Sequence, residues 1–299
     1  MKYILYPGCC LEGNGKPCGE SILSVLKALD SPLEELKDWG CCGATAYMSV
    51  DELKSFTLCS RNMAMAIAQY GAAAKGALHL VAPCSACYSL MIKTQHYIEE
   101  KPEIGKVVKA ALKEVGLESE GLHTRVTIRH PLDVLVNDIG LERIKEKAKK
   151  SLKGLKVACY YGCLLVRPYN TFDSAYNPVT MDRLAAALGA EPVDWPLKTR
   201  CCGATLSGTI PGVGTRLSYL ILKEAKKRGA EWVLTACPVC QMDLECFQEQ
   251  MNKRFNDNIQ IPVLYFSQLV GMAFEIPGKE IGLQRLLIQP KLSAAIQGG

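Results

Sequence analysis

Short apolar runs recur along the chain, and longer stretches with helical periodicity separate them. The runs lie at residues 3–6, 78–82, 126–128, 156–160, 232–236 and 261–266. Apolar runs of this length, bounded by glycine, proline or polar residues, are typical of buried strands. The pattern therefore predicts a strand at each of these positions.

Helical patterns lie between the strands of the first half. The segment Ser49-Val50-Asp51-Glu52 resembles a capping box and predicts the start of a long helix. Gly71 or Gly76 then predicts its end.

The second half repeats this arrangement. Thr209 and Pro211 predict the start of a helix, and Gly229 predicts its end after three consecutive cations. Shorter helical patterns follow the last predicted strand of each half, at residues 132–136 and 269–274.

Three cysteine motifs occur twice, in the same order and at similar spacing. The matched pairs are Tyr6-Pro7-Gly8-Cys9 with Tyr160-Tyr161-Gly162-Cys163, Cys41-Cys42-Gly43-Ala44-Thr45 with Cys201-Cys202-Gly203-Ala204-Thr205, and Cys84-Ser85-Ala86-Cys87 with Cys237-Pro238-Val239-Cys240. Asp38-Trp39 and Asp194-Trp195 match in the same frame. Such repetition indicates a duplication over nearly the whole chain.

Alternation of strand and helix predicts an α/β protein made of two tandem duplicated domains, each a small parallel sheet flanked by helices. We expect the domains at residues 1–145 and 146–299, with the linker in the polar stretch 140–154. Binding sites of parallel sheets form beyond the carboxyl ends of the strands. The recurrent cysteines follow strands at those ends.

Composition narrows the function classes. The 299 residues are 48% hydrophobic and 22% charged, which is typical of a folded globular protein. A net charge of +5 without a dense basic block disfavours nucleic-acid binding. The most basic stretch, Lys145 to Lys156, mixes Lys with Glu at helical spacing and predicts a solvated helix face.

Nothing in the pattern predicts a membrane span, because every uncharged run falls short of about 18 apolar residues. Residues 1–9 contain too short an apolar run for a secretory signal. We therefore expect a cytoplasmic protein. In that reducing compartment, clustered thiols bind metals or carry redox chemistry more often than they form structural disulfides.

Each half supplies five recurrent thiols, one more than a tetrahedral zinc site or a cubane iron–sulfur cluster takes. A vicinal Cys-Cys pair addresses two neighbouring irons more readily than one metal, so a multinuclear cluster fits better. Buried core cysteines are the competing interpretation. The ten candidate ligands are Cys9, Cys41, Cys42, Cys84, Cys87, Cys163, Cys201, Cys202, Cys237 and Cys240.

The remaining cysteines have no counterpart in the other half, and we expect them to be ordinary core or surface thiols. They are Cys10, Cys18, Cys59, Cys159 and Cys246. The Tyr-x-Gly-Cys match favours Cys163 over Cys159 and Cys9 over Cys10 as leading ligands.

A single cysteine, a Cys-Cys-Gly motif and a CxxC motif, present twice, resemble the CCG-domain family and within it the B subunits of heterodisulfide reductases. The resemblance covers essentially the whole chain. It implies two noncubane [4Fe-4S] clusters, each held by the five cysteines of one half, with a disulfide cleaved between them. It also implies two partners, a small iron–sulfur subunit and a flavin-containing subunit.

Other residues are candidates for proton transfer or substrate binding. His130, after a predicted strand, is a candidate proton donor, although a structural histidine is the favoured interpretation. Lys16, Arg167 and Arg200 follow or precede cluster cysteines and are candidates to hold an anionic thiol substrate. No complete phosphate-binding loop or dinucleotide fingerprint is present.

Three alternatives stay open. The first is a related subunit of sulfur oxidation that acts on a persulfide or a protein-bound thiol. The second is a noncatalytic scaffold or electron-transfer subunit with structural clusters or zinc. The third is a subunit of a quinone or organic-acid oxidoreductase that carries CCG domains, although the ferredoxin segment often fused to those proteins is not visible in this sequence.

Overall fold

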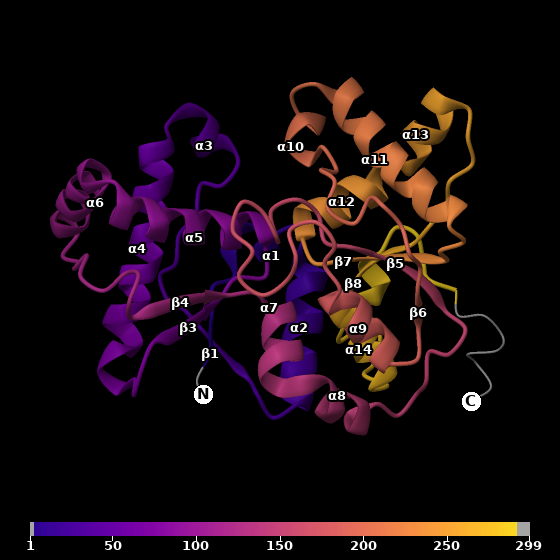
Figure 1. Ribbon diagram of the computed structural model, residues 1–299, viewed down its shortest axis with the longest axis horizontal. Helices are drawn as coiled ribbons and strands as arrows, with labels where there is room; N and C mark the ends of the chain where they lie inside the picture. Colours follow the sequence, from indigo (N-terminus) through magenta and orange to yellow (C-terminus); the bar gives the residue numbers. More distant parts are fainter. Residues whose placement is uncertain (1–2, 292–299) are drawn as a thin grey trace.

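The computed structural model describes residues 3–291 and folds them into two parallel four-stranded sheets with helices packed around them (Figure 1). The first sheet has the order β2-β1-β3-β4 and the second the order β6-β5-β7-β8, so both halves share one topology. All pairings within each sheet are parallel. The predicted α/β duplication is confirmed.

The strands of the first sheet are β1 (Tyr3–Leu5), β2 (Leu33–Glu35), β3 (Leu78–Val81) and β4 (Val126–Arg129). Those of the second sheet are β5 (Lys156–Tyr160), β6 (Glu191–Pro192), β7 (Trp232–Thr235) and β8 (Val263–Tyr265). The central strands are buried on both faces, as expected for parallel sheets covered by helices.

All six apolar runs form strands, but β2 and β6 were not predicted. Both are edge strands with short, polar sequences, Leu-Glu-Glu and Glu-Pro. An edge strand is covered by neighbours on fewer sides, so it needs no apolar run that a pattern could reveal.

The first half contains α1 (Gly8–Glu12), α2 (Lys16–Ala28), α3 (Ala46–Val50), α4 (Glu52–Tyr70), α5 (Ser85–Glu100) and α6 (Pro102–Glu114). After β4 come α7 (Pro131–Asp133), a π-helical segment (Val134–Gly140) and α8 (Leu141–Lys147). The second half contains α9 (Thr180–Ala187), α10 (Ala204–Ser207), α11 (Pro211–Lys227), α12 (Pro238–Cys246), α13 (Gln248–Phe255) and α14 (Phe266–Ala273).

One predicted helix start is wrong in detail. The cap of α4 is Asp51, whose carboxylate accepts hydrogen bonds from the backbone N–H groups of Leu53 and Lys54, while Ser49 lies in α3. The predicted start of the second-half helix is confirmed, because α11 begins at Pro211.

The predicted helical face over Lys145 to Lys156 is also wrong beyond its first turn. Helix α8 ends at Lys147, and residues 148–155 connect it to β5. This connection falls in the predicted linker region, and the division at residue 145 stays a prediction.

The two halves pack closely against each other through α2 and α14. Ser21 of α2 and Ser267 of α14 share a buried hydroxyl hydrogen bond of 2.7 Å. The segment after α14 crosses back to the first half, where Arg285 pairs with Glu20 of α2.

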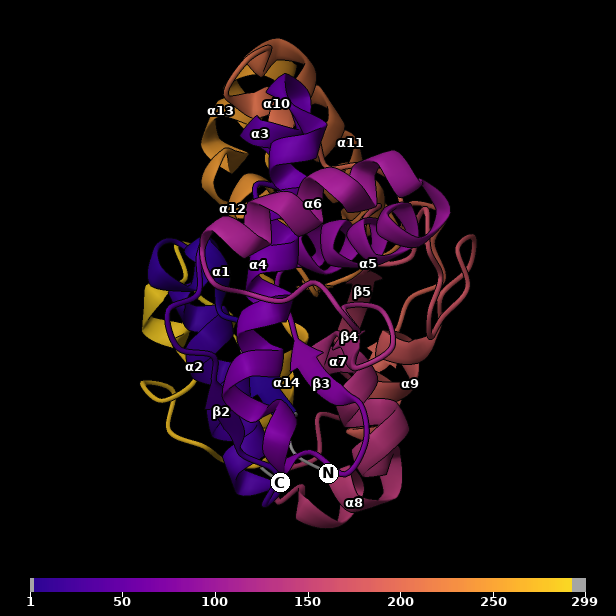
Figure 2. The ribbon, with the colours of Figure 1, turned by 90° about the vertical axis from the view of Figure 1, so that its left-hand side faces the viewer.

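This packing places the carboxyl ends of both sheets toward the same region. In both ribbon views, α3 and α10, which follow the two Cys-Cys-Gly motifs, lie at the same end of the molecule, opposite α8 (Figures 1 and 2). Among the described residues, no helix is both long and apolar enough to cross a membrane.

Candidate metal centres

The structure brings the ten recurrent thiols together as one continuous run. In the first half, the sulfur of Cys9 lies 3.9 Å from that of Cys41, and the sulfur of Cys42 lies 2.9 Å from that of Cys87. Cys41 also contacts Cys42, and Cys84 contacts Cys87. These five residues are the first quintet.

The second quintet repeats these contacts. The sulfur of Cys202 lies 3.5 Å from that of Cys240. Cys201 contacts both Cys163 and Cys202, and Cys240 contacts Cys237. The order of contacts is therefore the same in both halves.

The two quintets meet at the first cysteines of the CxxC motifs. The thiol of Cys84 lies close enough to that of Cys237 to raise its pKa, and both thiols are buried. Cys84 is the N-cap of α5 and Cys237 is the N-cap of α12. The amino ends of two helices therefore adjoin the junction.

Thiol contacts shift acidity within each quintet. Hydrogen bonds from Cys41 and then Cys87 lower the pKa of Cys42 to about 4. Hydrogen bonds from Cys163 and then Cys202 lower the pKa of Cys201 to about 2, and the guanidinium of Arg167 acts in the same direction. Each half thus stabilises one thiolate through its neighbours, while the pKa values of Cys41 and Cys163 rise for the same reason.

The glycine after each Cys-Cys pair adopts a backbone conformation that other residues rarely take. Gly43 has φ of +80° and Gly203 has φ of +93°. A Cβ atom on Gly203 would lie 2.9 Å from the Cα of Gly214, a contact that the backbone must move to relieve. Glycine therefore allows the chain to turn both sulfurs of the pair toward the site.

In each half, a tyrosine at the carboxyl end of the first strand hydrogen-bonds to the backbone just before the Cys-Cys pair. The hydroxyl of Tyr6 donates to the carbonyl of Gly40 at 2.8 Å, and that of Tyr160 donates to the carbonyl of Arg200 at 2.6 Å. Both carbonyls directly precede the Cys-Cys pair. The Tyr-x-Gly-Cys repeat signalled these tyrosines, but no role for them was predicted.

The second half also contains a buried carboxylate that was not predicted. Asp243 on α12 accepts hydrogen bonds from the hydroxyls of Ser207, at 2.5 Å, and Ser218, at 2.6 Å. Burial raises the pKa of Asp243, and it also contacts the thiol of Cys202. Its position three residues after a CxxC motif was the available sequence signal.

The cysteines without counterparts are divided between core and surface. Cys59 and Cys159 are fully buried, and Cys246 is exposed. Cys18 is buried beside Cys237 and Cys84. Desolvation raises the pKa of the Cys18 thiol, and negative charge on those two sulfurs raises it further. Cys10 is half-buried and lines the cleft over the first quintet.

The other candidates are more scattered. Lys16 is exposed at the first residue of α2, and Arg200 is exposed and contributes its carbonyl to Tyr160. Arg167 donates to the carbonyl of Thr199 and lines a hollow of about 580 Å³ beside Cys163. His130 is fully buried, with both ring nitrogens hydrogen-bonded to backbone groups.

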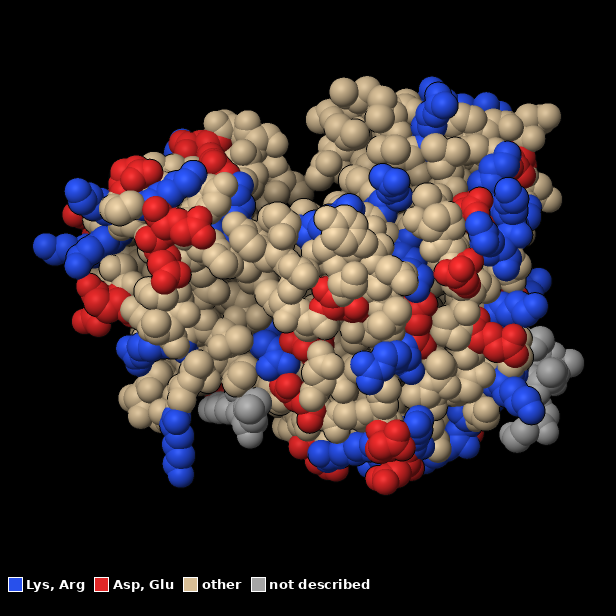
Figure 3. Space-filling model, viewed as in Figure 1, with Lys and Arg blue, Asp and Glu red and all other residues tan. Residues whose placement is uncertain are grey.

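A cleft of about 640 Å³ opens over the first quintet and reaches the second half. Figure 3 shows the notch between the α3 lobe and the α10–α11 lobe. Its walls include the five thiols of the first quintet together with Ala204, Thr205 and Val239 of the second half. None of the residues that line it is Lys, Arg, His, Asp or Glu.

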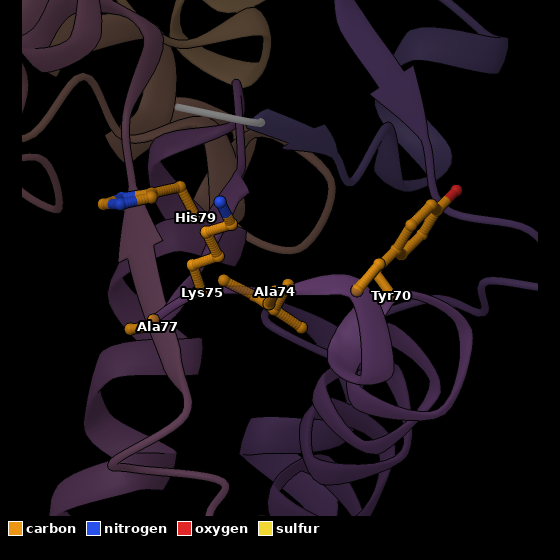
Figure 4. A pocket seen from close by; sticks show the side chains of 8 residues that line it. Tyr70, Ala74, Lys75, Ala77 and His79 are labelled. Atoms are coloured by element: carbon orange, nitrogen blue, oxygen red, sulfur yellow. The ribbon is translucent and has the colours of Figure 1, made fainter.

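Another hollow, also of about 640 Å³, lies at the opposite end of β3 from the thiols. Tyr70, Lys75 and His79 contribute to its walls (Figure 4). No cysteine is among its lining residues, so it is separate from the site described above.

A duplicated parallel sheet with five clustered thiols at each carboxyl edge defines a tandem cysteine-rich protein. The chain belongs to the cysteine-rich domain family, CCG, whose family model matches residues 3–93 and 157–245. The resemblance drawn from the sequence is therefore confirmed.

Relatives that match over nearly their whole length are named either for a fumarate reductase or for heterodisulfide reductases. The chain is 30% identical over 289 residues to the 8-methylmenaquinol:fumarate reductase membrane anchor subunit of Wolinella succinogenes, covering 96% of this chain and 97% of that one. It is 29% identical over 300 residues to the B subunit of the ferredoxin:CoB-CoM heterodisulfide reductase of Methanosarcina mazei, with 96% and 94% coverage. It is 30% identical over 295 residues to a protein of Archaeoglobus profundus that is named for its likeness to heterodisulfide reductase B subunits, with 95% and 94% coverage.

The fold also resembles a crystal structure of a hypothetical protein from Helicobacter pylori. The TM-score is 0.74 at 15% sequence identity. The match covers 97% of this chain and 52% of that chain, so this chain spans about half of its length. At this identity the similarity concerns the fold alone.

The glycine geometry leads to a stability prediction. Gly203→Ala should lower the free energy of unfolding by more than about 1 kcal/mol, because alanine is strained at positive φ and its methyl group meets the backbone of Gly214. Urea unfolding of the metal-free protein followed by circular dichroism measures the change. Gly208→Ala is the matched control, since its Cβ meets no atom within 4 Å; equal losses in both variants would contradict the assignment.

Proposed function

We propose that the chain is the iron–sulfur subunit of a heterodisulfide-reductase-like complex, which reduces a disulfide or carries out the reverse thiol oxidation. Two noncubane [4Fe-4S] clusters, one for each quintet, are the proposed cofactors. The observation that carries this proposal is the symmetric run of ten contacting thiols with its junction at Cys84 and Cys237. The similarity to heterodisulfide reductase B subunits supports it.

The donor set fits a multinuclear cluster. Among the residues that the structure describes, no three His, Cys, Asp or Glu side chains converge as they would around a single metal ion. The thiols instead contact one another in pairs along a line. Thiols spaced along a line suit a cluster of several irons, because each iron then needs only one or two thiolates from the protein.

When bound, iron–sulfur clusters transfer electrons one at a time, and two of them could supply the two electrons that a disulfide requires. The reduction breaks one S–S bond and consumes two electrons and two protons, releasing two thiols. The chain holds the two quintets in contact, and its cleft gives a substrate access to the first of them.

Partner subunits would supply the electrons. The sequence shows neither a flavin site nor a ferredoxin-type cysteine run, so we propose a small iron–sulfur subunit and a flavin-containing subunit as partners. Cys9, Cys41 and Cys201 are exposed, so electrons can reach both quintets from the surface. We propose that the complex works in the cytoplasm.

Arg167 is the candidate that the geometry favours for holding an anionic substrate. It lines the hollow beside Cys163 and lies close enough to Cys201 to affect its pKa. Lys16 and Arg200 do not line either hollow next to the thiols. We therefore propose Arg167 as the anion-binding residue of the second quintet.

A second candidate function has a specific observation in its favour. The Wolinella succinogenes relative is a subunit of a quinol:fumarate reductase, and the cleft over the first quintet is lined by no Lys, Arg, His, Asp or Glu side chain. In this candidate, the chain transfers electrons within an oxidoreductase for a quinol and an organic acid. A quinol, but no disulfide, would then change the redox state of the protein.

The cluster proposal predicts metal content. Protein purified without oxygen should contain about eight irons, because two clusters of four are proposed. Cys42→Ser should lower the iron content by about half, since it removes a ligand of one cluster only. Inductively coupled plasma mass spectrometry measures this, with Cys246→Ser as the exposed control outside the run; wild-type protein that contains only zinc would reject the proposal.

The substrate proposal predicts a charge-selective defect. Adding an anionic disulfide to reduced protein should change its electron paramagnetic resonance (EPR) spectrum. Arg167→Gln should raise the disulfide concentration required by about tenfold, because a charge-assisted hydrogen bond contributes about 1.5 kcal/mol or more. An uncharged disulfide should show no such shift, and Arg228→Gln, which removes a cation paired with Glu224 on α11, is the matched control. Equal shifts for charged and uncharged disulfides would contradict the role of Arg167.

A further inference from the structure

His130 occupies the point where the two quintets meet. It directly follows β4 and is fully buried. Its Nδ1 accepts a hydrogen bond from the backbone N–H of Leu132 at 3.2 Å, so the ring proton is at Nε2. Burial keeps the ring neutral by lowering its pKa to about 4.

The single N–H group at Nε2 is shared between the two halves. It lies 3.2 Å from the carbonyl oxygen of Pro83 and 3.1 Å from that of Ala236. These carbonyls belong to the residues directly before Cys84 and Cys237. One donor therefore ties together the turns that carry the first cysteine of each CxxC motif.

The surroundings of the imidazole hold it in place. Tyr88 of α5 contacts it edge-on with ring centroids 5.7 Å apart, and Phe172 of the second half stacks at 6.5 Å. The hydroxyl of Ser85 donates to the same Ala236 carbonyl at 3.4 Å. Aromatic rings from both halves thus enclose this pair of hydrogen bonds.

The two halves differ at this point. His130 follows β4, whereas Phe266 follows β8, the equivalent strand of the second sheet. The ring of Phe266 packs on His130 with centroids 6.1 Å apart. One imidazole therefore serves both CxxC turns, and the duplication supplies no second copy of it.

We propose that His130 is a positioning residue that sets the separation and orientation of Cys84 and Cys237, and through them the electronic coupling of the two clusters. The hydrogen bonds from Nε2 fix the turns, and the turns fix the two sulfurs. The coupling depends on the proposed function, whereas the placement of the two thiols does not.

Two amide variants separate this role from simple packing. The side-chain nitrogen of His130→Gln can take the place of Nε2 and donate to the two carbonyls. The shorter side chain of His130→Asn can accept from the Leu132 N–H as Nδ1 does, but it cannot reach the carbonyls. Both variants place an amide in the same buried site.

The experiment compares these variants by EPR of the full chain after anaerobic purification. We expect the spin–spin interaction between the two clusters to be present in wild type and His130→Gln, and to be lost in His130→Asn at matched iron content. His96→Gln, at a half-buried histidine stacked on Tyr169, should match wild type. Any other ranking of the two amide variants overturns the proposal.

A second measurement uses the iron-free protein. A short bifunctional thiol reagent should join Cys84 to Cys237 in wild type and His130→Gln, as identified by mass spectrometry of the cross-linked peptides. The cross-link should be lost in His130→Asn, and its persistence there overturns the proposal. If wild type binds no iron, the proposed function fails, and this measurement still decides the role of His130.

Discussion

Ten thiols gathered in one run, each near the next, are the constraint on which the rest of this structure depends. Neighbouring thiols and burial raise the pKa values of Cys87 and Cys240, so ionising all ten thiols as metal ligands would bring repulsion between like charges. Thiol hydrogen bonds and the amino ends of α5 and α12 offset part of it. Bound cations would offset the remainder, which is why this arrangement favours metal clusters over free thiols.

Duplication explains most of the site, but a few residues near the thiols occur in one half and not in the other. The strand orders, the positive φ of Gly43 and Gly203, and the tyrosine anchors are the same in both halves. His130 and Asp243 are not repeated: Phe266 and Leu90 stand at the corresponding places. The shared fold supplies two similar sets of donors, and these single residues distinguish the junction and the second quintet.

The sequence was sufficient where the relevant contacts are local or repeated. The six apolar strands, the family and the gathering of the ten recurrent cysteines could be predicted from short apolar runs and paired motifs. The edge strands β2 and β6 were missed because partial exposure leaves them no apolar signature. The hydrogen bonds of His130 to Pro83 and Ala236 could not be predicted, because both join residues far apart in the sequence and the second joins the two halves, and no local pattern records such a contact.

X-ray diffraction from anaerobically grown crystals, with anomalous data collected at the iron absorption edge, would show whether each quintet holds its own group of irons. We expect two separate groups of iron atoms, one at the carboxyl edge of each sheet, with the five sulfurs of one quintet around each group. Single metal ions in place of these groups, or disulfide bonds joining the ten cysteines to one another, would contradict it.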